Sequence, residues 1–261
     1  MSAGRQPLFG KRVLVTRAAH QAGDFAARLR EAGAEPIIAP TIAICPPIDV
    51  PAARDAVAHV RDYAWIAFTS RNGVDAFFDL LGEAGRDARA VGDVKIAAIG
   101  PKTAQALSAR GIRADLVPPL YVNEAVAAEL LARTAAGERV LVFRAEEARD
   151  VLPRTLREAG RIVDDVAGYA TRFVRDPELA AKAERADIVT FTSASTVRGF
   201  AYNVPDAARM LESKTVAAIG PIAARSARDA GIRVDVVADA FTVEGLITAL
   251  DVRASGTTAT A

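Results

Sequence analysis

Hydroxyl, amide and basic side chains gather directly after short apolar runs of this 261-residue sequence. Such hydroxyls cap the free backbone amides of a following helix, and those amides together with the helix dipole attract anions. An ordinary helix cap is the better explanation of any single position, but together the positions favour a small polyanionic ligand. The candidate positions are Thr16-Arg17, 69–72, 100–103 and Asn123-Glu124 in the first half, and Arg144, Arg149, 192–196 and Gly220-Pro221 in the second.

Motifs for nucleotide binding, hydrolysis and metal binding are missing from the sequence. It contains neither Gly-x-Gly-x-x-Gly nor a phosphate loop ending in Gly-Lys-Ser/Thr, which argues against a nicotinamide or nucleotide cofactor. A Gly-x-Ser-x-Gly elbow is absent too, so a hydrolase triad has little support. With one cysteine and two histidines, a disulfide framework and a cysteine- or histidine-rich metal centre are excluded. We therefore expect no cofactor and no metal.

Single reactive residues have ordinary structural explanations. His20 is expected at an exposed helix start rather than against a ligand, His59 on the surface, and Cys45 packed as a small hydrophobe. The charged run at 146–150 is typical of a solvated helix start. Arg149 is the exception, because it follows a strand end and could meet a ligand.

Alternating short β-rich runs and helix-like segments must position these residues. The expected strands are 13–16, 65–69, 95–99, 114–117, 140–143, 188–191, 215–219 and 234–237, and the expected helices include 24–32, 73–81, 103–110 and 122–133. Gly33, Gly111, Gly160 and Gly231 follow such helical segments, where a left-handed cap favours glycine. The pattern predicts an α/β fold with parallel sheets flanked by helices, whose ligands bind at the carboxyl ends of the strands.

The sequence repeats itself. Residues 12–18 (RVLVTRA) return at 139–145 (RVLVFRA), and Leu-Arg-Glu-Ala-Gly at 29–33 returns at 156–160. Phe-Thr-Ser at 68–70, Ala-Ile-Gly-Pro at 98–101 and Gly-Ile-Arg at 111–113 return at 191–193, 218–221 and 231–233, in the same order, and Glu124 matches Glu244. Because the period exceeds 100 residues, the chain contains two copies of a domain-sized unit, near 11–130 and 138–250, rather than a solenoid.

Composition limits the class of protein. Hydrophobic residues make up 51% of the chain and the net charge is +1, which suits real cores and argues against a general nucleic-acid binder. No apolar run is long enough to cross a bilayer, and residues 1–11 lack the apolar segment of a signal peptide. We expect a soluble, cytoplasmic protein with a flexible tail at 254–261.

The ordered motifs resemble uroporphyrinogen-III synthase. They are Val-Thr-Arg (15–17), Phe-Thr-Ser-Arg-Asn-Gly-Val (68–74), Ala-Ile-Gly-Pro-Lys-Thr-Ala (98–104), Arg144 with Leu152-Pro153, Gly-Tyr-Ala-Thr around Tyr169, 191–200 and the second Ala-Ile-Gly-Pro. The resemblance implies two α/β domains joined by a two-stranded linker, with the substrate in the cleft between them. Carried onto this chain, 1–40 with 174–255 form domain one, 44–170 form domain two, and linker strands lie near 40–44 and 169–173. The two copies would then exchange their opening segments.

The resemblance also implies a reaction. Hydroxymethylbilane, a linear tetrapyrrole with eight carboxylates, would be cyclised to uroporphyrinogen III with inversion of ring D and loss of water, in tetrapyrrole (heme) biosynthesis. Loss of the terminal hydroxyl would leave an azafulvene that attacks the substituted carbon of ring D, giving a spiro intermediate that fragments and recloses. Such chemistry depends on positioning more than on a strong acid or a metal.

Site residues follow from the same resemblance. Tyr169 is the candidate general acid, with a purely structural linker tyrosine as the alternative, and no side chain is expected to be indispensable. The expected substrate-binding residues are Arg17, Thr69, Ser70, Asn72, Lys102, Thr103, Arg144, Arg149, Thr192, Ser193 and Ser195. Two positions depart from the family pattern: Ala223 replaces a common threonine and Phe241 a common tyrosine.

A rival interpretation is a non-catalytic module of the same fold that binds or senses a tetrapyrrole or another polyanion. Because only a short segment follows the second copy, we expect no fused DNA-binding domain. The expected partner is the small-molecule substrate, with no nucleic acid and no membrane. We expect a monomer that also makes transient contact with the enzyme that precedes it in the pathway.

Overall fold

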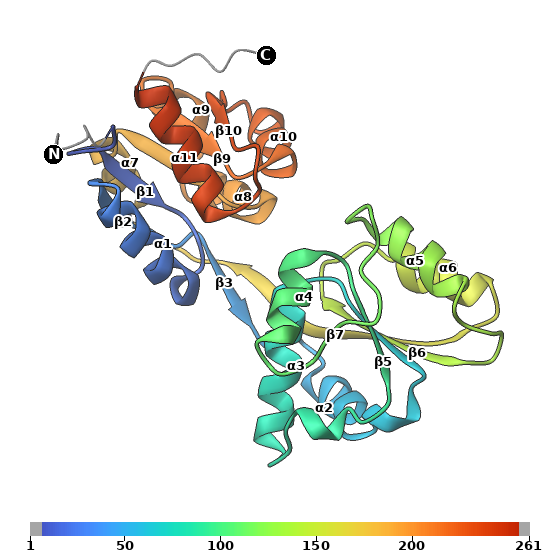
Figure 1. Cartoon of the computed structure of the whole chain (residues 1–261). Coiled ribbons are helices and arrows are strands. Elements are labelled where there is room, and N and C mark those ends of the chain that lie inside the picture. Colours follow the sequence, from blue (N-terminus) through green and yellow to red (C-terminus); the bar gives the residue numbers. More distant parts are fainter. Residues whose placement is uncertain (1–6, 256–261) are drawn as a thin grey trace, which may run out of the picture. The chain divides into compact units, whose positions relative to one another are not determined.

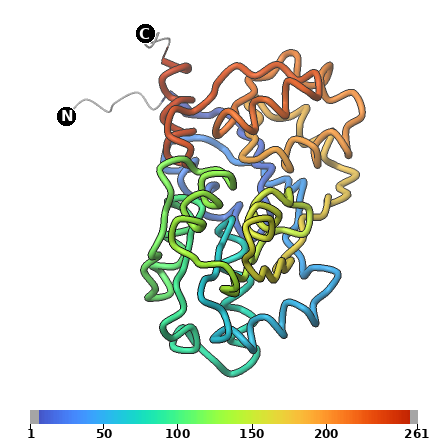
Figure 2. Tube along the Cα trace, turned by 90° about the vertical axis from the view of Figure 1, so that its right-hand side faces the viewer, coloured from blue at the N-terminus to red at the C-terminus, as the bar shows by residue number. Residues whose placement is uncertain are grey.

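The computed structural model describes residues 7–255, which form two compact units. Residues up to Ala43 and from Arg172 onward build unit 1, and Ile44–Thr171 build unit 2. Figure 2 shows the same division along the chain, with the blue start and the orange-to-red end in one unit and the cyan-to-green middle in the other. The chain passes between the units along strands β3 (Ile42–Cys45) and β7 (Ile162–Phe173) (Figure 1).

Unit 1 is built on a five-stranded sheet in the order β10-β9-β8-β1-β2, in which neighbouring strands are parallel. Side chains alternate between its faces, so Val13 and Val15 pack on one side and Leu14 on the other. Helices α1 and α11 cover the first face, and α7, α8 and α10 cover the second. The elements are β1 (Arg12–Val15), α1 (Ala19–Glu31), β2 (Glu35–Ile38), α7 (Leu179–Arg185), β8 (Ile188–Phe191), α8 (Ala194–Asn203), α9 (Ala207–Met210), β9 (Thr215–Ala218), α10 (Pro221–Asp229), β10 (Val236–Val237) and α11 (Val243–Ala254).

Unit 2 repeats this plan with the sheet order β3-β7-β6-β4-β5. Helices α2, α3 and α4 pack on the face that carries Ile66 and Phe68, while α5 and α6 pack on the face that carries Trp65 and Ala67. The remaining elements are α2 (Val50–Ala58), η1 (Val60–Asp62), β4 (Trp65–Phe68), α3 (Arg71–Glu83), η2 (Ala88–Ala90), β5 (Lys95–Ala98), α4 (Pro101–Ser108), α5 (Asn123–Leu131), β6 (Arg139–Ala145) and α6 (Val151–Glu158).

The two sheets correspond strand by strand once the internal repeat is followed. The repeated opening strand is β1 in unit 1 and β6 in unit 2, although β1 comes from the first copy and β6 from the second. The Phe-Thr-Ser strand is β8 in unit 1 and β4 in unit 2. Each sheet therefore combines the opening segment of one copy with the later segments of the other.

The predicted α/β fold with parallel sheets is confirmed, and the predicted strands appear within two residues of their bounds with one exception. Residues 114–117 form only an isolated bridge, between Leu116 and Ala97, so the expected strand there is wrong. In unit 1 the Ala238 N–H extends the corresponding ladder by donating to Ala218 O at 3.1 Å. The equivalent residue of unit 2 is Pro118, which has no N–H to donate, and the ladder stops.

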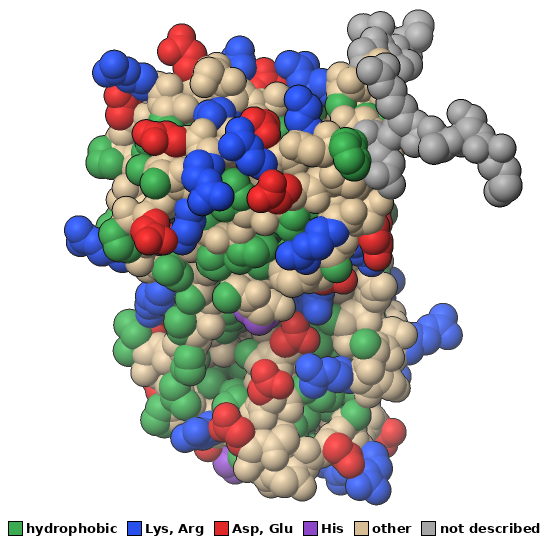
Figure 3. All heavy atoms as spheres, turned by 90° about the vertical axis from the view of Figure 1, so that its left-hand side faces the viewer, with side chains coloured by type: hydrophobic (Ala, Val, Ile, Leu, Met, Phe, Trp, Pro, Cys, Tyr) green, Lys and Arg blue, Asp and Glu red, His purple; other side chains and the backbone are tan. Residues whose placement is uncertain are grey.

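Several smaller predictions can also be compared with the structure. Gly33 and Gly160 both have φ of 82°, as the left-handed caps require. His20 and His59 are exposed, and Cys45 is half-buried at the end of β3. Of the expected tail, Ala254 ends α11 and Ser255 follows it, while 256–261 lie outside the described residues. Acidic and basic side chains are interspersed on the face shown in Figure 3, consistent with the near-neutral charge.

Candidate functional site

Two hydroxyl groups meet at the carboxyl edge of the unit 2 sheet. Ser70 follows β4 and is the N-cap of α3, where its Oγ accepts a hydrogen bond from Gly73 N–H at 3.0 Å. The phenolic oxygen of Tyr169, on β7, lies 2.8 Å from Ser70 Oγ. The 13-residue helix α3 thus presents its amide end beside a tyrosine hydroxyl, an arrangement that combines anion binding with a proton donor.

Burial raises the pKa of the tyrosine in this pair. Tyr169 is 7% exposed, and desolvation raises the pKa of its phenol above the ordinary value, against the opposing effect of hydrogen bonds from Ser70 and Asn72. Asn72 itself is half-buried in the first turn of α3. Near neutral pH the phenol is therefore protonated, and it can act as a hydrogen-bond donor or a weak acid, not as a base.

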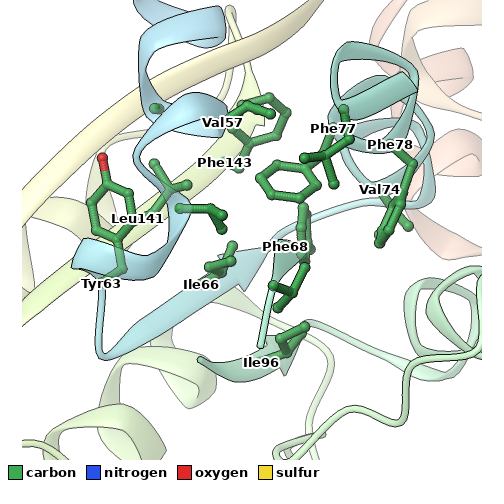
Figure 4. Packing of buried hydrophobic residues seen from close by; sticks show 14 of the residues in the cluster. Val57, Tyr63, Ile66, Phe68, Val74, Phe77, Phe78, Ile96, Leu141 and Phe143 are labelled. Atoms are coloured by element: carbon green, nitrogen blue, oxygen red, sulfur yellow. The ribbon is translucent and has the colours of Figure 1, made fainter. Parts of the chain in front are cut away.

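A β-bulge places the tyrosine. The register between β6 and β7 shifts after Arg144 pairs with Ala167, so that Ala145 pairs with Tyr169 and Gly168 is passed over. An ideal Cβ at Gly168 would lie 2.0 Å from Cε1 of Phe143, so only glycine fits there. Phe143 in turn packs edge-to-face against Phe68 and Phe77 in the buried core of unit 2 (Figure 4).

The Arg144 side chain is largely buried and hydrogen-bonds to protein groups at the end of β6 and on β7. Its Nε and Nη2 donate to the two carboxylate oxygens of Asp165 at 2.5 and 2.8 Å, and both side chains are 15% exposed. Its Nη1 donates to the carbonyls of Ala145 and Ala148 at 3.3 and 2.7 Å. Hydrogen bonding to Asp165 also raises the pKa of the Arg144 guanidinium. The structure thus engages Arg144 with protein groups, where it fixes the turn after β6 and the bulged strand β7.

The turn after β6 is also tied to its neighbours by two acidic residues. Glu146 N–H donates to Tyr169 O at 2.8 Å, and its carboxylate accepts from Ile48 N–H at 3.0 Å. Glu147 accepts from Thr171 N–H at 3.3 Å. These hydrogen bonds attach the turn after β6 to the strand that carries Tyr169. Part of the charged run at 146–150, which the sequence predicts to be solvated, therefore has a structural role.

Other predicted residues of unit 2 differ in how accessible they are. Arg149 is 68% exposed and lies 3.3 Å from Glu124, an exposed ion pair of the kind that contributes little and exchanges partners readily. Lys102 is exposed at the start of α4, and Thr69 is half-buried. Thr103 is 3% exposed, and its counterpart Ala223 is 2% exposed. The hydroxyl missing at Ala223 would therefore be a buried one.

Unit 1 carries a hydroxyl cluster at the matching edge. Ser193 caps α8 in a capping box, in which its Oγ accepts from Thr196 N–H and Thr196 Oγ1 accepts from Ser193 N–H, each at 3.2 Å. Ser195 Oγ lies 2.9 Å from Ser193 Oγ, and Thr192 is half-buried beside them. Arg17, after β1, donates to Gln21 at 3.1 Å.

Sequence reasoning named Ser70, Asn72 and Tyr169 but missed the groups that hold them. Asp165, Phe143 and Gly168 were not among its candidates. An isolated glycine within a strand is a known signal of a bulge, and the Gly168-Tyr169 pair carries that signal. Among residues 7–255 there is no cluster of three or more metal-binding side chains, and no helix there is long and apolar enough to span a membrane.

The fold and this site define a duplicated α/β protein in which a serine-capped helix begins at the carboxyl edge of the sheet in each unit. A family model described as "Uroporphyrinogen-III synthase HemD" matches residues 23–248. A uroporphyrinogen-III synthase of Synechococcus elongatus is 35% identical over 97% of this chain and 99% of its own length. The porphyrin biosynthesis protein HemD of Ruminiclostridium josui is 34% identical over 93% of this chain, which spans only 48% of that relative. The chain belongs to the uroporphyrinogen-III synthase family.

Solved structures share the fold. A uroporphyrinogen III synthase mutant from Thermus thermophilus matches with a TM-score of 0.65 and 21% identity, over 95% of this chain and 99% of that one. The enzyme from Helicobacter pylori matches with a TM-score of 0.60 and 17% identity, over 92% and 97%. These matches extend over both units.

Proposed function

We propose that this chain is an enzyme that cyclises hydroxymethylbilane to uroporphyrinogen III, with inversion of ring D and loss of water. Family membership supports the reaction, and the observation that carries it to particular residues is the hydroxyl pair of Ser70 and Tyr169 at the N-terminus of α3. A binding module without chemistry has no need of a protonated phenol whose position is set by a bulge.

Tyr169 assists departure of the substrate hydroxyl. Its phenolic proton passes to the leaving oxygen, the carbon–oxygen bond breaks, and water leaves behind the azafulvene cation. The proton returns to the phenolate when the closed ring loses its own proton, and Ser70 can donate to the phenolate in the interval. Because the phenol has a raised pKa, it is a weak acid, and the pyrrole nitrogen supplies most of the driving force. Tyr169 therefore accelerates the reaction without being indispensable.

Positioning supplies the isomer selectivity. Free hydroxymethylbilane closes at the unsubstituted carbon of ring D, so the protein must hold that ring with its substituted carbon facing the cation. The substrate's carboxylates offer many handles for this purpose. The N-termini of α3 and α8, with the capping hydroxyls Ser70 and Ser193, bind carboxylates through backbone amides.

Basic and polar side chains complete the binding set. Arg149, after β6, exchanges Glu124 for a substrate carboxylate, and Lys102 after β5 and Arg17 after β1 add positive charge at the ends of those strands. The other proposed contacts are Thr69, Asn72, Thr192 and Ser195. We assign Arg144 to holding the bulged strand and Thr103 to the interior of unit 2, because both are engaged or buried there.

The proposed setting follows from the same chemistry. We propose that the chain works as a monomer in the cytoplasm without cofactor or metal, and that it takes its short-lived substrate through transient contact with the enzyme that makes it. It binds neither nucleic acid nor membrane.

A coupled assay tests the proposal. Hydroxymethylbilane is generated in place, cyclised with and without the protein, oxidised, and the porphyrin isomers are separated by chromatography. We expect predominantly type III product with wild type and a slower reaction of the same selectivity with Tyr169→Phe. Type I product at the uncatalysed level with wild type would overturn the assignment.

A further inference from the structure

In both units an aromatic ring lies directly on a glycine at the carboxyl edge of the sheet. An ideal Cβ at Gly100 would lie 3.1 Å from Cγ of Tyr121, and one at Gly220 would lie 3.0 Å from Cδ1 of Phe241. The two glycines precede α4 and α10 and have extended φ values of −171° and 176°, which any residue can adopt. A side chain at either position would therefore press on the ring, although the backbone conformation would accept it.

The Tyr121 and Phe241 rings contact these glycines but are not buried. Tyr121 is 58% exposed and Phe241 is 52% exposed. Around Tyr121 the loop also exposes apolar side chains, with Leu120 at 68% and Val122 at 44%. A flat aromatic surface held against the backbone and left largely in water is available for contact with a planar apolar group.

Tyr121 lies at the same sheet edge as the hydroxyl pair of unit 2. Phe68 and Ala98 are register partners on β4 and β5, and Ile99 N–H donates to Phe68 O at 3.0 Å. Two residues further on, just past the ends of these strands, Ser70 and Gly100 are the N-caps of α3 and α4. Ser70, whose Oγ lies 2.8 Å from the Tyr169 hydroxyl, and Gly100, which Tyr121 covers, follow neighbouring strands, so the hydroxyl pair and the Tyr121 ring are about one strand spacing apart, or about 5 Å.

We propose that the exposed face of Tyr121 is a stacking surface for one pyrrole ring of a linear tetrapyrrole, and that Phe241 offers the equivalent surface in unit 1. This inference rests on the proposed function and adds a determinant of specificity to it. Helix N-termini and basic side chains can bind the carboxylates of the substrate. Its electron-rich pyrrole rings are bound best by aromatic side chains, in offset-stacked or edge-to-face contacts. A long substrate with a ring on Tyr121 and its leaving hydroxyl near Tyr169 would lie along one edge of the sheet.

Substitutions at Tyr121 separate the ring from its hydroxyl and from its apolar bulk. Tyr121→Phe keeps the ring, Tyr121→Leu keeps apolar volume without a ring, and Tyr121→Ala removes both. The control is Tyr202→Ala, because Tyr202 is 56% exposed but lies near the far end of α8, about 12 Å along the helix from its N-terminus. Gly100→Ala retains the ring and displaces it by its new methyl group.

The measurements are KM and kcat with prepared hydroxymethylbilane, the fraction of type III product, and the thermal midpoint of each variant. We expect Tyr121→Ala and Tyr121→Leu to raise KM by about 3- to 10-fold, with a lower type III fraction and little change in kcat. Tyr121→Phe and Tyr202→Ala should keep the wild-type KM, and Gly100→Ala should give an intermediate one.

Two results would overturn the inference while leaving the proposed function intact. One is a wild-type KM in Tyr121→Leu, which would make the residue an apolar cover only. The other is a KM that rises only in variants whose thermal midpoint falls, and in proportion to that fall. Failure of the wild-type protein to form type III product would instead refute the proposed function.

Discussion

Replacing Gly168 by alanine should damage both the stability of unit 2 and the placement of Tyr169. The new Cβ would lie 2.0, 2.5 and 2.6 Å from Cε1, Cζ and Cδ1 of Phe143. Carbon atoms normally approach to about 3.5–4.0 Å, so the overlap is about 1.5 Å. Phe143 is 0% exposed and enclosed by Phe68 and Phe77, with ring centroids 6.2 and 5.4 Å away, so it cannot retreat.

The expected cost is that of an overpacked core. Inserting one methylene equivalent into a filled interior costs about 1–3 kcal/mol, and because strand β7 itself must move we expect a loss of about 3 kcal/mol in the free energy of unfolding. The same movement shifts the Tyr169 hydroxyl from its 2.8 Å contact with Ser70. A displacement of about 1 Å can lower kcat by about 100-fold.

Urea unfolding followed by circular dichroism measures the stability change, and the coupled isomer assay measures activity. Gly82→Ala is the matched control, because an ideal Cβ at this glycine of α3 has no atom within 4 Å. It should raise the free energy of unfolding by about 0.5–1 kcal/mol through helix propensity. A Gly168→Ala protein within about 0.5 kcal/mol of wild type would refute the packing argument.

Three further predictions concern the site and its frame. Tyr169→Phe should lower kcat by about 10- to 100-fold while leaving the type III fraction near that of wild type, and complete loss of turnover in a folded variant would contradict its assisting role. Asp165→Asn leaves the Arg144 guanidinium, 15% exposed, without its anion and should destabilise the protein by about 3 kcal/mol in urea, whereas an unchanged midpoint would show that the pair is dispensable. Hydrogen bonds from Arg12 lower the pKa of Asp187 from 3.8 to about 2, so its stabilisation is complete above the unfolded value and is lost as the pH falls from 3.8 towards 2. Asp187→Asn should therefore flatten the acid limb of a stability–pH curve, and an unchanged slope over that range would exclude this pair as a contributor.

Local pattern was enough to predict most of the fold. Short apolar runs followed by polar turns located β1, β4, β5, β6, β8 and β9, and glycines located helix ends, because both signals are set by neighbours in the chain. The cause of the failure at 114–117 is only partly local. Pro118 was visible in the sequence, but its effect depends on which N–H the neighbouring strand needs, and this is a property of the sheet.

The candidate site was less predictable, because its geometry joins residues far apart in sequence. Ser70 and Tyr169 were both candidates, yet their contact spans 99 residues and depends on the bulge at Gly168. The polar start of β7, with Asp164 and Asp165, hid that strand from a search for apolar runs. Without β7 next to β6, Arg144 had no visible partner and was assigned to the substrate.

The central claim, that this chain directs ring D inversion, is tested most directly by the isomer distribution as a function of protein concentration. With hydroxymethylbilane supplied at a constant rate, the type III fraction should rise with added protein until it approaches the whole of the product, and Gly82→Ala should follow the same curve. A distribution that stays at the uncatalysed type I level at every concentration of folded protein would contradict the account.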